Sequence, residues 1–291
     1  MSLKIYINGE LVDKVNATIS VYDHGLLYGD GVFEGMRSYA GTVFRLSEHL
    51  DRLWDSAAAI QLTIPLSKDD MAAAVIQTLA VNQIEDGYIR LVVTRGVGTL
   101  GLDPNRCRNP QVIIIVASIQ LYPKAFYEKG LEIVTVPTTR NHTNAVNPAI
   151  KSLNYLNNIL AKIEASNAGC VEAIMLNSQG YVAECTGDNI FILKHGKMYT
   201  PSLASGALHG ITRSVAMELA EGLDIKISEP NLTRYDLYNA DECFITGTAA
   251  EVVPVVKIDG RKIGTGRPGK HTKAFMQAYH ALTNASGAEI L

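Results

Sequence analysis

Pro148-Ala-Ile-Lys151-Ser-Leu-Asn-Tyr155 contains a lysine just ahead of a predicted helix, and three later segments contain groups that would complete a site around it. They are Glu184-Cys-Thr-Gly-Asp-Asn-Ile190, Gly210-Ile-Thr-Arg213 and Gly247-Thr-Ala-Ala250. In order, the four segments supply an amine, a carboxylate and two turns of small residues rich in backbone donors. An amine can form a Schiff base, a carboxylate can hold a pyridinium proton, and donor-rich turns can bind phosphate. Pyridoxal 5'-phosphate needs all three, so the combination predicts that cofactor.

The size and composition of the chain are those of an ordinary globular protein. Its 291 residues exceed the usual length of one domain, so we expect two domains that share a cleft. We predict a small N-terminal α/β domain at residues 1–120, an interdomain linker at 121–130 and a large cofactor-binding domain at 131–291. The hydrophobic fraction of 47% and the charged fraction of 19% are typical of a soluble protein. A net charge of −3 argues against a nucleic-acid partner.

Several other classes of protein are disfavoured. Residues 1–9 already indicate a strand and a turn, so we expect no signal peptide. The longest apolar run, residues 112–117, is far too short to cross a bilayer, and no membrane partner is expected. The four cysteines are widely spaced without a Cys-x-x-Cys pair, which favours reduced thiols in a cytoplasm. The seven histidines show no metal-ligand spacing, so we expect no metal site.

Turn and cap signals define the elements of the first half. Asn8-Gly9 between apolar runs predicts a hairpin, because both residues tolerate positive φ. Ser67 followed by Asp70 resembles the capping box of a helix. The predicted strands lie at residues 5–7, 10–12, 32–39, 42–45, 88–94 and 111–118, and a further helix lies at 47–60.

The second half again mixes strands and helices, so the predicted fold class is α/β. We expect a helix from Ser152 to Ala168 that ends at Gly169, a typical C-terminal cap. Its apolar stripe would consist of Leu153, Leu156, Leu160 and Ile163. The other expected strands are 131–137, 172–176, 190–193 and 242–246, with a helix at 212–222.

Two nucleotide-binding motifs are present but lack their context. Gly96-Val-Gly-Thr-Leu-Gly101 matches a dinucleotide fingerprint, yet Pro104 and Pro110 exclude the helix that must follow it. We expect a loop there. Gly264-Thr-Gly-Arg-Pro-Gly-Lys270 resembles a Walker A loop, but His271 stands where a magnesium-binding Ser or Thr is needed. We reject both as nucleotide sites.

Taken together, the four segments and their neighbours resemble the class-IV aminotransferases, the fold-type IV family of pyridoxal-phosphate enzymes. The matching motifs are Lys151-Ser-Leu-Asn-Tyr-Leu-Asn-Asn158, Glu184-x-x-x-x-Asn-Ile-Phe191, Gly210-Ile-Thr-Arg213 and Ala240-Asp-Glu-x-Phe-x-Thr-Gly-Thr-Ala-Ala-Glu251. The resemblance extends from Tyr28 to Thr272. It implies a two-domain α/β fold like that of D-amino-acid aminotransferases, pyridoxal 5'-phosphate as cofactor, and a homodimer or larger homo-oligomer.

The resemblance also implies roles for individual residues. Lys151 would form the Schiff base and then act as acid and base in turn, and Glu184 would keep the pyridine nitrogen protonated. Tyr155 would donate to the ring oxygen. It follows the lysine by four residues where some branched-chain enzymes have five, and four is the better same-face spacing on a helix. The phosphate would be bound by Arg52, Ile211, Thr212 and Thr248.

The first half resembles the branched-chain group in Tyr28-Gly-Asp-Gly-Val-Phe-Glu-Gly-Met-Arg37 and Tyr88-Ile-Arg90. Tyr28 and Phe33, with Tyr122 as a further candidate, would give an apolar surface for aliphatic substrates. Arg90 would pair with the distal carboxylate of glutamate. The α-carboxylate common to all substrates would meet Tyr88 and the amides of Thr248 and Ala249. Arg37 is either a structural partner of Glu34 or a pocket residue.

Our hypothesis is therefore a transaminase that moves the amino group of leucine, isoleucine or valine to 2-oxoglutarate in two half-reactions. D-amino-acid or R-amine transaminases are the nearest alternatives. The D-selective group has an Arg-x-His clamp where this chain has Leu100 and Leu102, which counts against it. An aminodeoxychorismate lyase and a cofactor-binding protein without turnover remain further alternatives.

Overall fold

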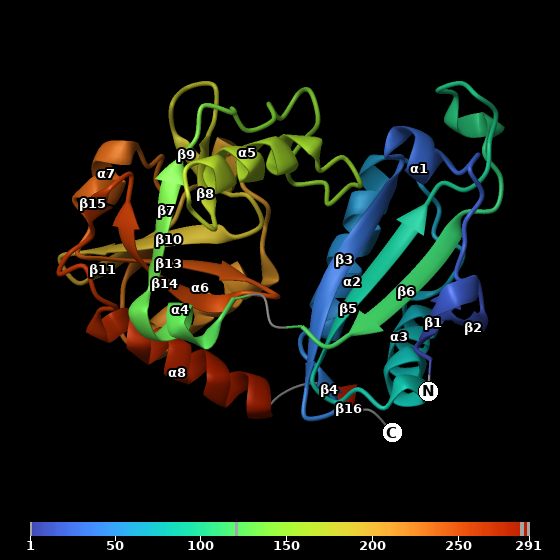
Figure 1. Cartoon of the computed structure of the whole chain (residues 1–291), viewed down its shortest axis with the longest axis horizontal. Coiled ribbons are helices and arrows are strands. Elements are labelled where there is room, and N and C mark those ends of the chain that lie inside the picture. The colour runs from blue at the N-terminus through green and yellow to red at the C-terminus, as the bar shows by residue number, and fades with distance from the viewer. Residues whose placement is uncertain (1, 120–121, 286–287, 290–291) are drawn as a thin grey trace. The chain divides into compact units, whose positions relative to one another are not determined.

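The structure, a computed structural model, describes residues 2–119, 122–285 and 288–289 (Figure 1). By their contacts they form two compact units. The first contains the described residues of 1–119, 150–154 and 283–291, and the second those of 120–149 and 155–282. The predicted α/β class is confirmed by the mixture of helices and strands. The domain boundaries expected from the sequence stay a prediction.

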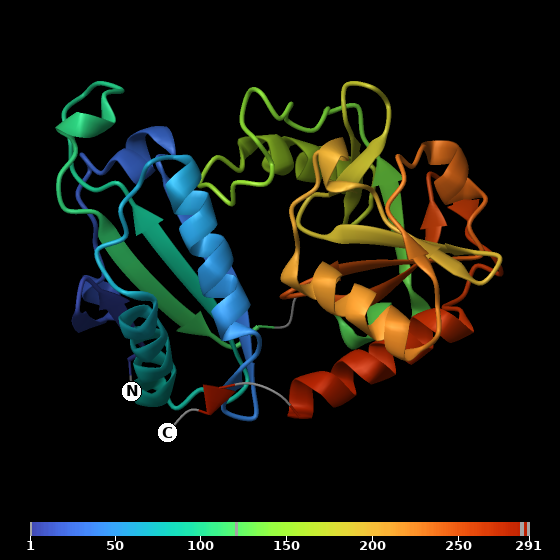
Figure 2. The same cartoon turned by 180° about the vertical axis from the view of Figure 1, so that it is seen from behind.

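The first unit is built on an antiparallel sheet of seven strands in the order β16-β4-β3-β5-β6-β1-β2. Helices α2 and α3 cover one face of this sheet (Figures 1 and 2). The elements are β1 Lys4–Ile7, β2 Glu10–Asp13, η1 Lys14–Asn16, α1 His24–Tyr28, β3 Gly31–Tyr39, β4 Thr42–Val43, α2 Leu46–Ala59, α3 Lys68–Asn82, β5 Gly87–Thr94, η2 Pro104–Arg106, β6 Gln111–Ala117 and β16 Ala288–Glu289.

Strand alternation gives this sheet two different faces. Val32 and Met36 of β3 pair with Val93 and Ile89 of β5, and all four are buried under α2 and α3. Because successive side chains of a strand point to opposite faces, the odd-numbered residues of β3 point away from the helices. The helix-covered face holds the apolar core, and Phe33, Gly35 and Arg37 lie on the opposite face.

The second unit contains a nine-stranded mixed sheet, in the order β12-β11-β10-β13-β14-β7-β8-β9 with β15 beside β14. Helix α5 lies on one side of it, and α6 and α8 lie on the other (Figures 1 and 2). The elements are α4 Lys124–Lys129, β7 Leu131–Thr135, α5 Leu156–Asn167, β8 Ala173–Leu176, β9 Val182–Cys185, β10 Asn189–Lys194, β11 Lys197–Tyr199, η3 Leu203–Ser205, α6 Ile211–Gly222, β12 Ile227–Ser228, α7 Arg234–Tyr238, β13 Glu242–Gly247, β14 Glu251–Ile258, β15 Arg261–Lys262 and α8 Lys270–Ala285.

Most predicted elements of the first unit are confirmed. Asn8 and Gly9 have φ of 51° and 98° between β1 and β2, as the hairpin requires. The Ser67 side chain accepts the Asp70 N–H at the start of α3. In the second unit, α4 occupies most of the segment predicted as an interdomain linker, and the linker assignment stays a prediction. Among the described residues, no helix has the length and apolar character needed to cross a membrane.

The predicted start of the helix after Lys151, at about Ser152, was wrong. The helix begins at Leu156, because the preceding residues are bonded to the edge of β3. The Phe33 N–H donates to the Lys151 carbonyl at 3.0 Å, and the Leu153 N–H donates to the Gly31 carbonyl at 3.0 Å. The bond to the Lys151 carbonyl uses a group that would otherwise accept the first bond of the helix, and local sequence does not reveal these long-range partners.

The predicted apolar stripe of α5 faces outward. Leu156, Leu160 and Ile163 are 66%, 46% and 50% exposed, whereas Ala161 and Ala165 are fully buried. Helix α5 packs on β7 and β8 through its small residues, which permit close approach. Helical periodicity shows that a face is apolar, but it does not show which surface covers that face.

Candidate active site

The face of the first sheet opposite α2 and α3 brings together the predicted substrate residues. Arg37 pairs with Tyr88, and Gly35 pairs with Arg90, so their side-chain positions share one face with Phe33. The Arg90 Cζ lies 4.5 Å from the Phe33 ring centroid and 5.4 Å from that of Tyr88. Both distances are within cation–π range. The Arg90 guanidinium therefore contacts two aromatic rings, and we expect it to bind a substrate carboxylate.

Lys151 is held beside the same aromatic ring. Its Nζ lies 4.7 Å from the Phe33 ring centroid, and its backbone N–H donates to the Ser56 Oγ at 3.1 Å. Its carbonyl accepts the Phe33 N–H. The lysine backbone is thus fixed to both β3 and α2, and its amine and the Arg90 guanidinium both lie against Phe33.

Gly35 allows Tyr88 to cross β3. A Cβ on Gly35 would lie 2.3 Å from the Tyr88 hydroxyl oxygen, which is far closer than van der Waals contact. A larger residue would displace the phenol. A glycine at this strand position therefore places the Tyr88 hydroxyl over β3, on the face that contains Phe33.

Tyr28 is the last residue of α1 and is 38% exposed. The loop that follows it is attached to the lysine segment, because the Asn154 amide donates to the Gly29 carbonyl at 2.8 Å. Gly29 has a φ of 71°, a conformation that favours glycine. The structure thus connects the Tyr28 loop with the segment that contains Lys151.

Arg52 lies on the helix-covered side, paired with Glu34. The Arg52 Nε and Nη2 donate to Glu34 Oε1 and Oε2 at 2.7 and 2.8 Å, and His49 Nδ1 lies 2.7 Å from Oε2. Burial alone would raise the pKa of Glu34, but Arg52 and His49 outweigh it and hold that pKa well below its ordinary value. Burial lowers the pKa of His49 against the opposing effect of Glu34.

Of the two roles suggested for Arg37, a partnership with Glu34 is disfavoured by strand geometry. The two are three residues apart on β3, so their side chains point to opposite faces. The Arg37 guanidinium instead lies 5.0 Å from the Tyr39 ring centroid. A role for Arg37 in a pocket stays a prediction.

In the second unit, Glu184 is held by a residue that the sequence analysis missed. Arg140 Nη2 and Nε lie 2.8 and 3.0 Å from Glu184 Oε1, and the Leu208 N–H donates to Oε2 at 2.8 Å. Arg140 also donates to the side-chain oxygens of Asn157 and Asn158, which are on α5. A buried carboxylate needs such compensation. No local signal identified Arg140, because its partners are distant in sequence.

Asn189 connects this carboxylate to the turn before α6. Its amide nitrogen donates to the Leu208 carbonyl at 3.0 Å and to Glu184 Oε2 at 3.4 Å. A Cβ on Gly210 would lie 2.1 Å from the Asn189 Oδ1, so this approach requires glycine. Gly210 is the N-cap of α6 and makes no side-chain cap hydrogen bond. Ile211 and Thr212 are the first two residues of that helix, where backbone amides and the helix dipole favour an anion.

The turn between β13 and β14 contains Thr248 and Ala249. It begins at Gly247, where a Cβ would lie 2.0 Å from the Asp188 Oδ1. On β13, Thr246 pairs with Asn189, so both side chains point to one face. The Thr246 Oγ1 is buried without a hydrogen-bond partner among the described residues. An orphaned hydroxyl on the Asn189 face is a place where a polar ligand would be favourable.

Two aromatic candidates also lie in the second unit. Tyr155 is the N-cap residue of α5, with φ −97° and ψ 8°. Because Lys151 is outside the helix, the same-face argument for their spacing does not apply, and the role of Tyr155 stays a prediction. Tyr122 is 6% exposed, and its ring centroid lies 6.2 Å from that of Phe126. Burial raises its pKa.

The Walker-like segment precedes helix α8, but an acidic side chain already occupies the start of that helix. Glu242 Oε2 accepts the Thr272 N–H at 2.8 Å, and Oε1 accepts the His271 N–H at 3.2 Å. A Cβ on Gly269 would lie 2.0 Å from the Glu242 Cδ. A phosphate there would meet a carboxylate, which is consistent with the rejection of this motif.

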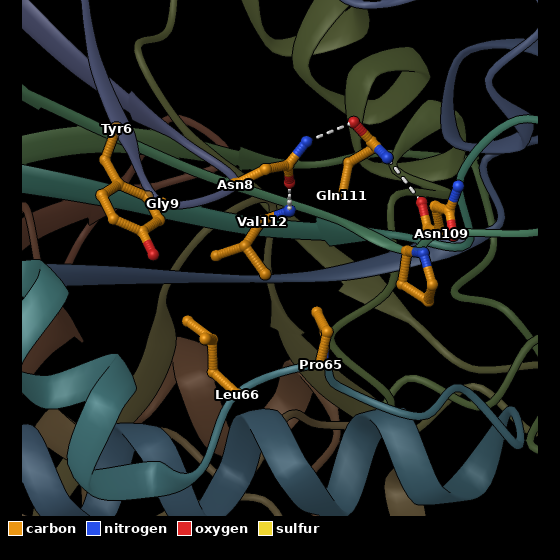
Figure 3. A pocket seen from close by; sticks show the side chains of 9 residues that line it. Tyr6, Asn8, Gly9, Pro65, Leu66, Asn109, Gln111 and Val112 are labelled. Atoms are coloured by element: carbon orange, nitrogen blue, oxygen red, sulfur yellow. Dashed lines mark hydrogen bonds between the residues drawn. The ribbon is translucent and has the colours of Figure 1, made fainter.

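One pocket of about 440 Å³ lies elsewhere in the first unit, between β1, β6 and the loop before α3 (Figure 3). It contains none of the predicted site residues and no charged side chain. It therefore offers no amine for a Schiff base and no cationic side chain for a phosphate. It is lined by Tyr6, Asn8, Gly9, Pro65, Leu66, Asn109, Pro110, Gln111 and Val112.

Comparison with known proteins identifies the family. Residues 31–258 match the family model described as amino-transferase class IV. The chain therefore belongs to the class IV aminotransferases, as its motifs predicted.

Its relatives are branched-chain enzymes. The chain is 50% identical over 288 residues to a putative branched-chain-amino-acid aminotransferase of Methanocaldococcus jannaschii, covering 99% of each chain. It is 42% identical to the branched-chain-amino-acid aminotransferase of Pseudomonas aeruginosa, covering 96% of this chain and 92% of that one. The crystal structure of the Escherichia coli branched-chain enzyme matches with a TM-score of 0.95 at 36% identity, covering 99% of this chain and 97% of that chain. The branched-chain enzyme of the thermophilic archaeon Thermoproteus uzoniensis, solved with norvaline, matches with a TM-score of 0.92 at 37% identity, covering 98% of this chain and 96% of that chain.

Proposed function

We propose that this protein is a pyridoxal-phosphate-dependent transaminase that moves the amino group of leucine, isoleucine or valine to 2-oxoglutarate. The main support within the structure is that Lys151 and Arg90 lie against the same Phe33 ring. The Lys151 amine, which would react with the cofactor, is thus adjacent to an apolar surface for an aliphatic side chain. The Arg90 cation, which would bind a second carboxylate, lies against the same surface. Relatives 37–50% identical are named as branched-chain aminotransferases.

The residues of each unit fit the cofactor. In the second unit, the Glu184 carboxylate would hold the ring nitrogen, and the amides of Ile211 and Thr212 would bind phosphate oxygens. The orphaned Thr246 hydroxyl shows that this face has unused hydrogen-bonding capacity. In the first unit, Lys151 would attach to the cofactor aldehyde. Roles for Arg52, Tyr155 and Thr248 in the same binding are part of this proposal.

The bound cofactor would supply an electron-withdrawing ring that stabilises negative charge at the substrate Cα. The Lys151 amine would remove the proton from Cα and return it one atom away, acting as base and then as acid. Glu184, which Arg140 fixes in place, would keep a proton on the ring nitrogen. Orientation by fixed groups matters because proton transfer needs the donor and acceptor within hydrogen-bond reach.

Recognition of both aliphatic and acidic substrates would use the face of the first sheet opposite α2 and α3. Phe33, with Tyr28 as a second aromatic ring, would contact the aliphatic side chains of leucine, isoleucine and valine. When glutamate or 2-oxoglutarate binds, Arg90 would pair with the distal carboxylate, and Arg37 is a second cation on that face. The α-carboxylate would meet Tyr88 and the amides of Thr248 and Ala249.

The test is an amine-donor screen with the purified protein. We expect glutamate to form from L-leucine and 2-oxoglutarate, and no product from D-alanine or a chiral R-amine with pyruvate. Activity with D-alanine or the R-amine alone would assign the protein to another branch of the family. Pyruvate release from aminodeoxychorismate without an amine acceptor would indicate a lyase. No reaction with any donor would leave a cofactor-binding protein.

We also propose that the protein is a cytoplasmic homodimer or larger homo-oligomer. The support for an oligomer is the apolar face of α5, where Leu156, Ile159, Leu160 and Ile163 are 46–66% exposed, and the support for a cytoplasmic location is that the four cysteines are free thiols. A second copy of the chain would remove this face from water. The double variant L160E/I163E should shift the protein toward monomer in light scattering after gel filtration. V81E, at another exposed apolar position, is the control.

A further inference from the structure

We propose that Glu34 is a positioning residue for the cofactor phosphate, because it fixes the guanidinium of Arg52 in the orientation needed to bind that anion. The inference rests on the proposed role of Arg52 as a phosphate ligand. Glu34 itself would not touch the cofactor.

The geometry is that of a clamped guanidinium. Glu34 is fully buried, and its two oxygens accept hydrogen bonds from two different nitrogens of Arg52. A bidentate pair of this kind fixes both the plane and the direction of the guanidinium. A single ion-pair contact, such as a lysine would make, would leave the cation free to rotate.

The carboxylate is itself fixed from two sides. His49 and the Gly35 N–H contact Glu34 Oε2 at 2.7 and 3.3 Å. His49 and Arg52 are three residues apart on α2, and therefore share one helix face. Ser56, which binds the Lys151 N–H, is four residues further on the same face. One face of α2 thus positions both the arginine and the lysine backbone.

Charge and orientation predict opposite effects of removing this carboxylate. If Glu34 acted only through its charge, a neutral residue would remove a repulsive anion and strengthen phosphate binding. If Glu34 acts by positioning, a neutral residue loosens Arg52 and weakens phosphate binding. The sign of the change in affinity therefore distinguishes the two.

The experiment compares two ligands on the full-length apoprotein. Pyridoxal 5'-phosphate and pyridoxal differ only in the phosphate, so the ratio of their dissociation constants isolates the phosphate contacts. For Glu34→Gln we expect affinity for the phosphorylated ligand to fall about 10-fold, with affinity for pyridoxal changed less than about 2-fold. Glu48→Gln removes an exposed carboxylate from α2, the helix that contains Arg52, and should leave both affinities unchanged.

Arg52→Lys provides a second variant if Glu34→Gln does not fold. It retains the positive charge but cannot form the two-nitrogen clamp, so the same selective loss is expected. The double variant should lose little more affinity for pyridoxal 5'-phosphate than either single variant, because each substitution breaks the same pair of hydrogen bonds between Glu34 and Arg52.

The contrary outcomes are distinct. Tighter binding of pyridoxal 5'-phosphate by Glu34→Gln would overturn the proposal in favour of a charge effect. An equal loss of affinity for both ligands would indicate general structural damage and would also overturn it. If Arg52→Ala leaves the ratio unchanged, Arg52 is not a phosphate ligand, and that part of the proposed function fails together with the inference. If Arg52→Ala changes the ratio but Glu34→Gln does not, only the inference fails.

Discussion

Arg140 and Glu184 form a buried ion pair in which two guanidinium nitrogens contact one carboxylate oxygen, at 2.8 and 3.0 Å. The other carboxylate oxygen accepts the Leu208 N–H. The pair connects the segment after β7 with β9 and with the loop that leads to α6. It therefore fixes the proposed ring-nitrogen ligand relative to the proposed phosphate-binding turn within the second unit.

Glu184→Gln should affect both catalysis and stability. A neutral amide would not hold the proton of the ring nitrogen, and we expect kcat to fall about 100-fold or more while the cofactor stays bound. Arg140 would lose its charged partner, which should cost roughly 1–3 kcal/mol of unfolding free energy. Steady-state kinetics and thermal unfolding of the apoprotein measure the two effects. Glu164→Gln, a carboxylate bonded to Thr138, is the comparison, and a wild-type rate for Glu184→Gln would contradict the assigned role.

Lys151→Ala should abolish covalent attachment of the cofactor without unfolding the protein. The backbone bonds of residue 151 to Ser56 and Phe33 do not involve the side chain, so they should persist. We expect no cofactor-modified peptide after borohydride reduction, and a rate at least about 10³-fold lower. Lys124→Ala, an exposed lysine of α4, should behave as wild type. If mass spectrometry finds covalent cofactor at wild-type stoichiometry, another lysine is the attachment site.

Arg90→Met should separate the two half-reactions. Methionine preserves an apolar contact with Phe33 but cannot pair with a carboxylate. The KM for 2-oxoglutarate should rise about 10-fold or more, because a charged hydrogen bond contributes roughly 1.5–3 kcal/mol. The kcat/KM for leucine in single-turnover measurements should change by less than about 3-fold. Arg106→Met is a control on an exposed loop, and equal losses for both substrates would refute the assignment.

The start of α8 predicts a specific dependence of stability on pH. Burial opposes the charged form of Glu242, but hydrogen bonds from Thr272 and His271 outweigh it and lower the pKa of this carboxyl from its ordinary value of 4.5. A lowered folded-state pKa stabilises the protein above the unfolded-state value, and this contribution is lost as the pH falls through the folded value. Glu242→Gln should therefore lower the free energy of unfolding by about 1 kcal/mol at pH 7.

Urea unfolding at several pH values tests this prediction. The difference in unfolding free energy between Glu242→Gln and wild type should be constant from pH 7 to about 5. It should shrink progressively below about 4.5. Glu221→Gln, an exposed position on α6, should show no such pattern. A difference that is independent of pH down to strongly acidic conditions would mean that the charge of Glu242 is not the cause.

Local signals in the sequence were reliable where the local backbone decides the structure. The Asn8-Gly9 turn, the Ser67 cap and the strand at residues 32–39 are confirmed because their causes lie within a few residues. The helix start at Leu156 and the outward face of α5 were predicted wrongly because distant segments decide them. The Arg140–Glu184 pair was missed for the same reason: its two members are 44 residues apart.

The sequence by itself determined the α/β class, the family and the order of the segments that contain the amine, the carboxylate and the donor-rich turns. The fold class and the order of these segments follow from residue types and spacing along the chain, and the family follows from the resemblance of their motifs to those of the class IV aminotransferases. Only the tertiary structure decided that the Lys151 carbonyl bonds to β3 and that the helix begins only at Leu156, that Glu34 holds Arg52, and that Arg140 holds Glu184. Each of these contacts compensates a buried charge or backbone group with a partner far away in sequence, and spacing along the chain does not record such partners.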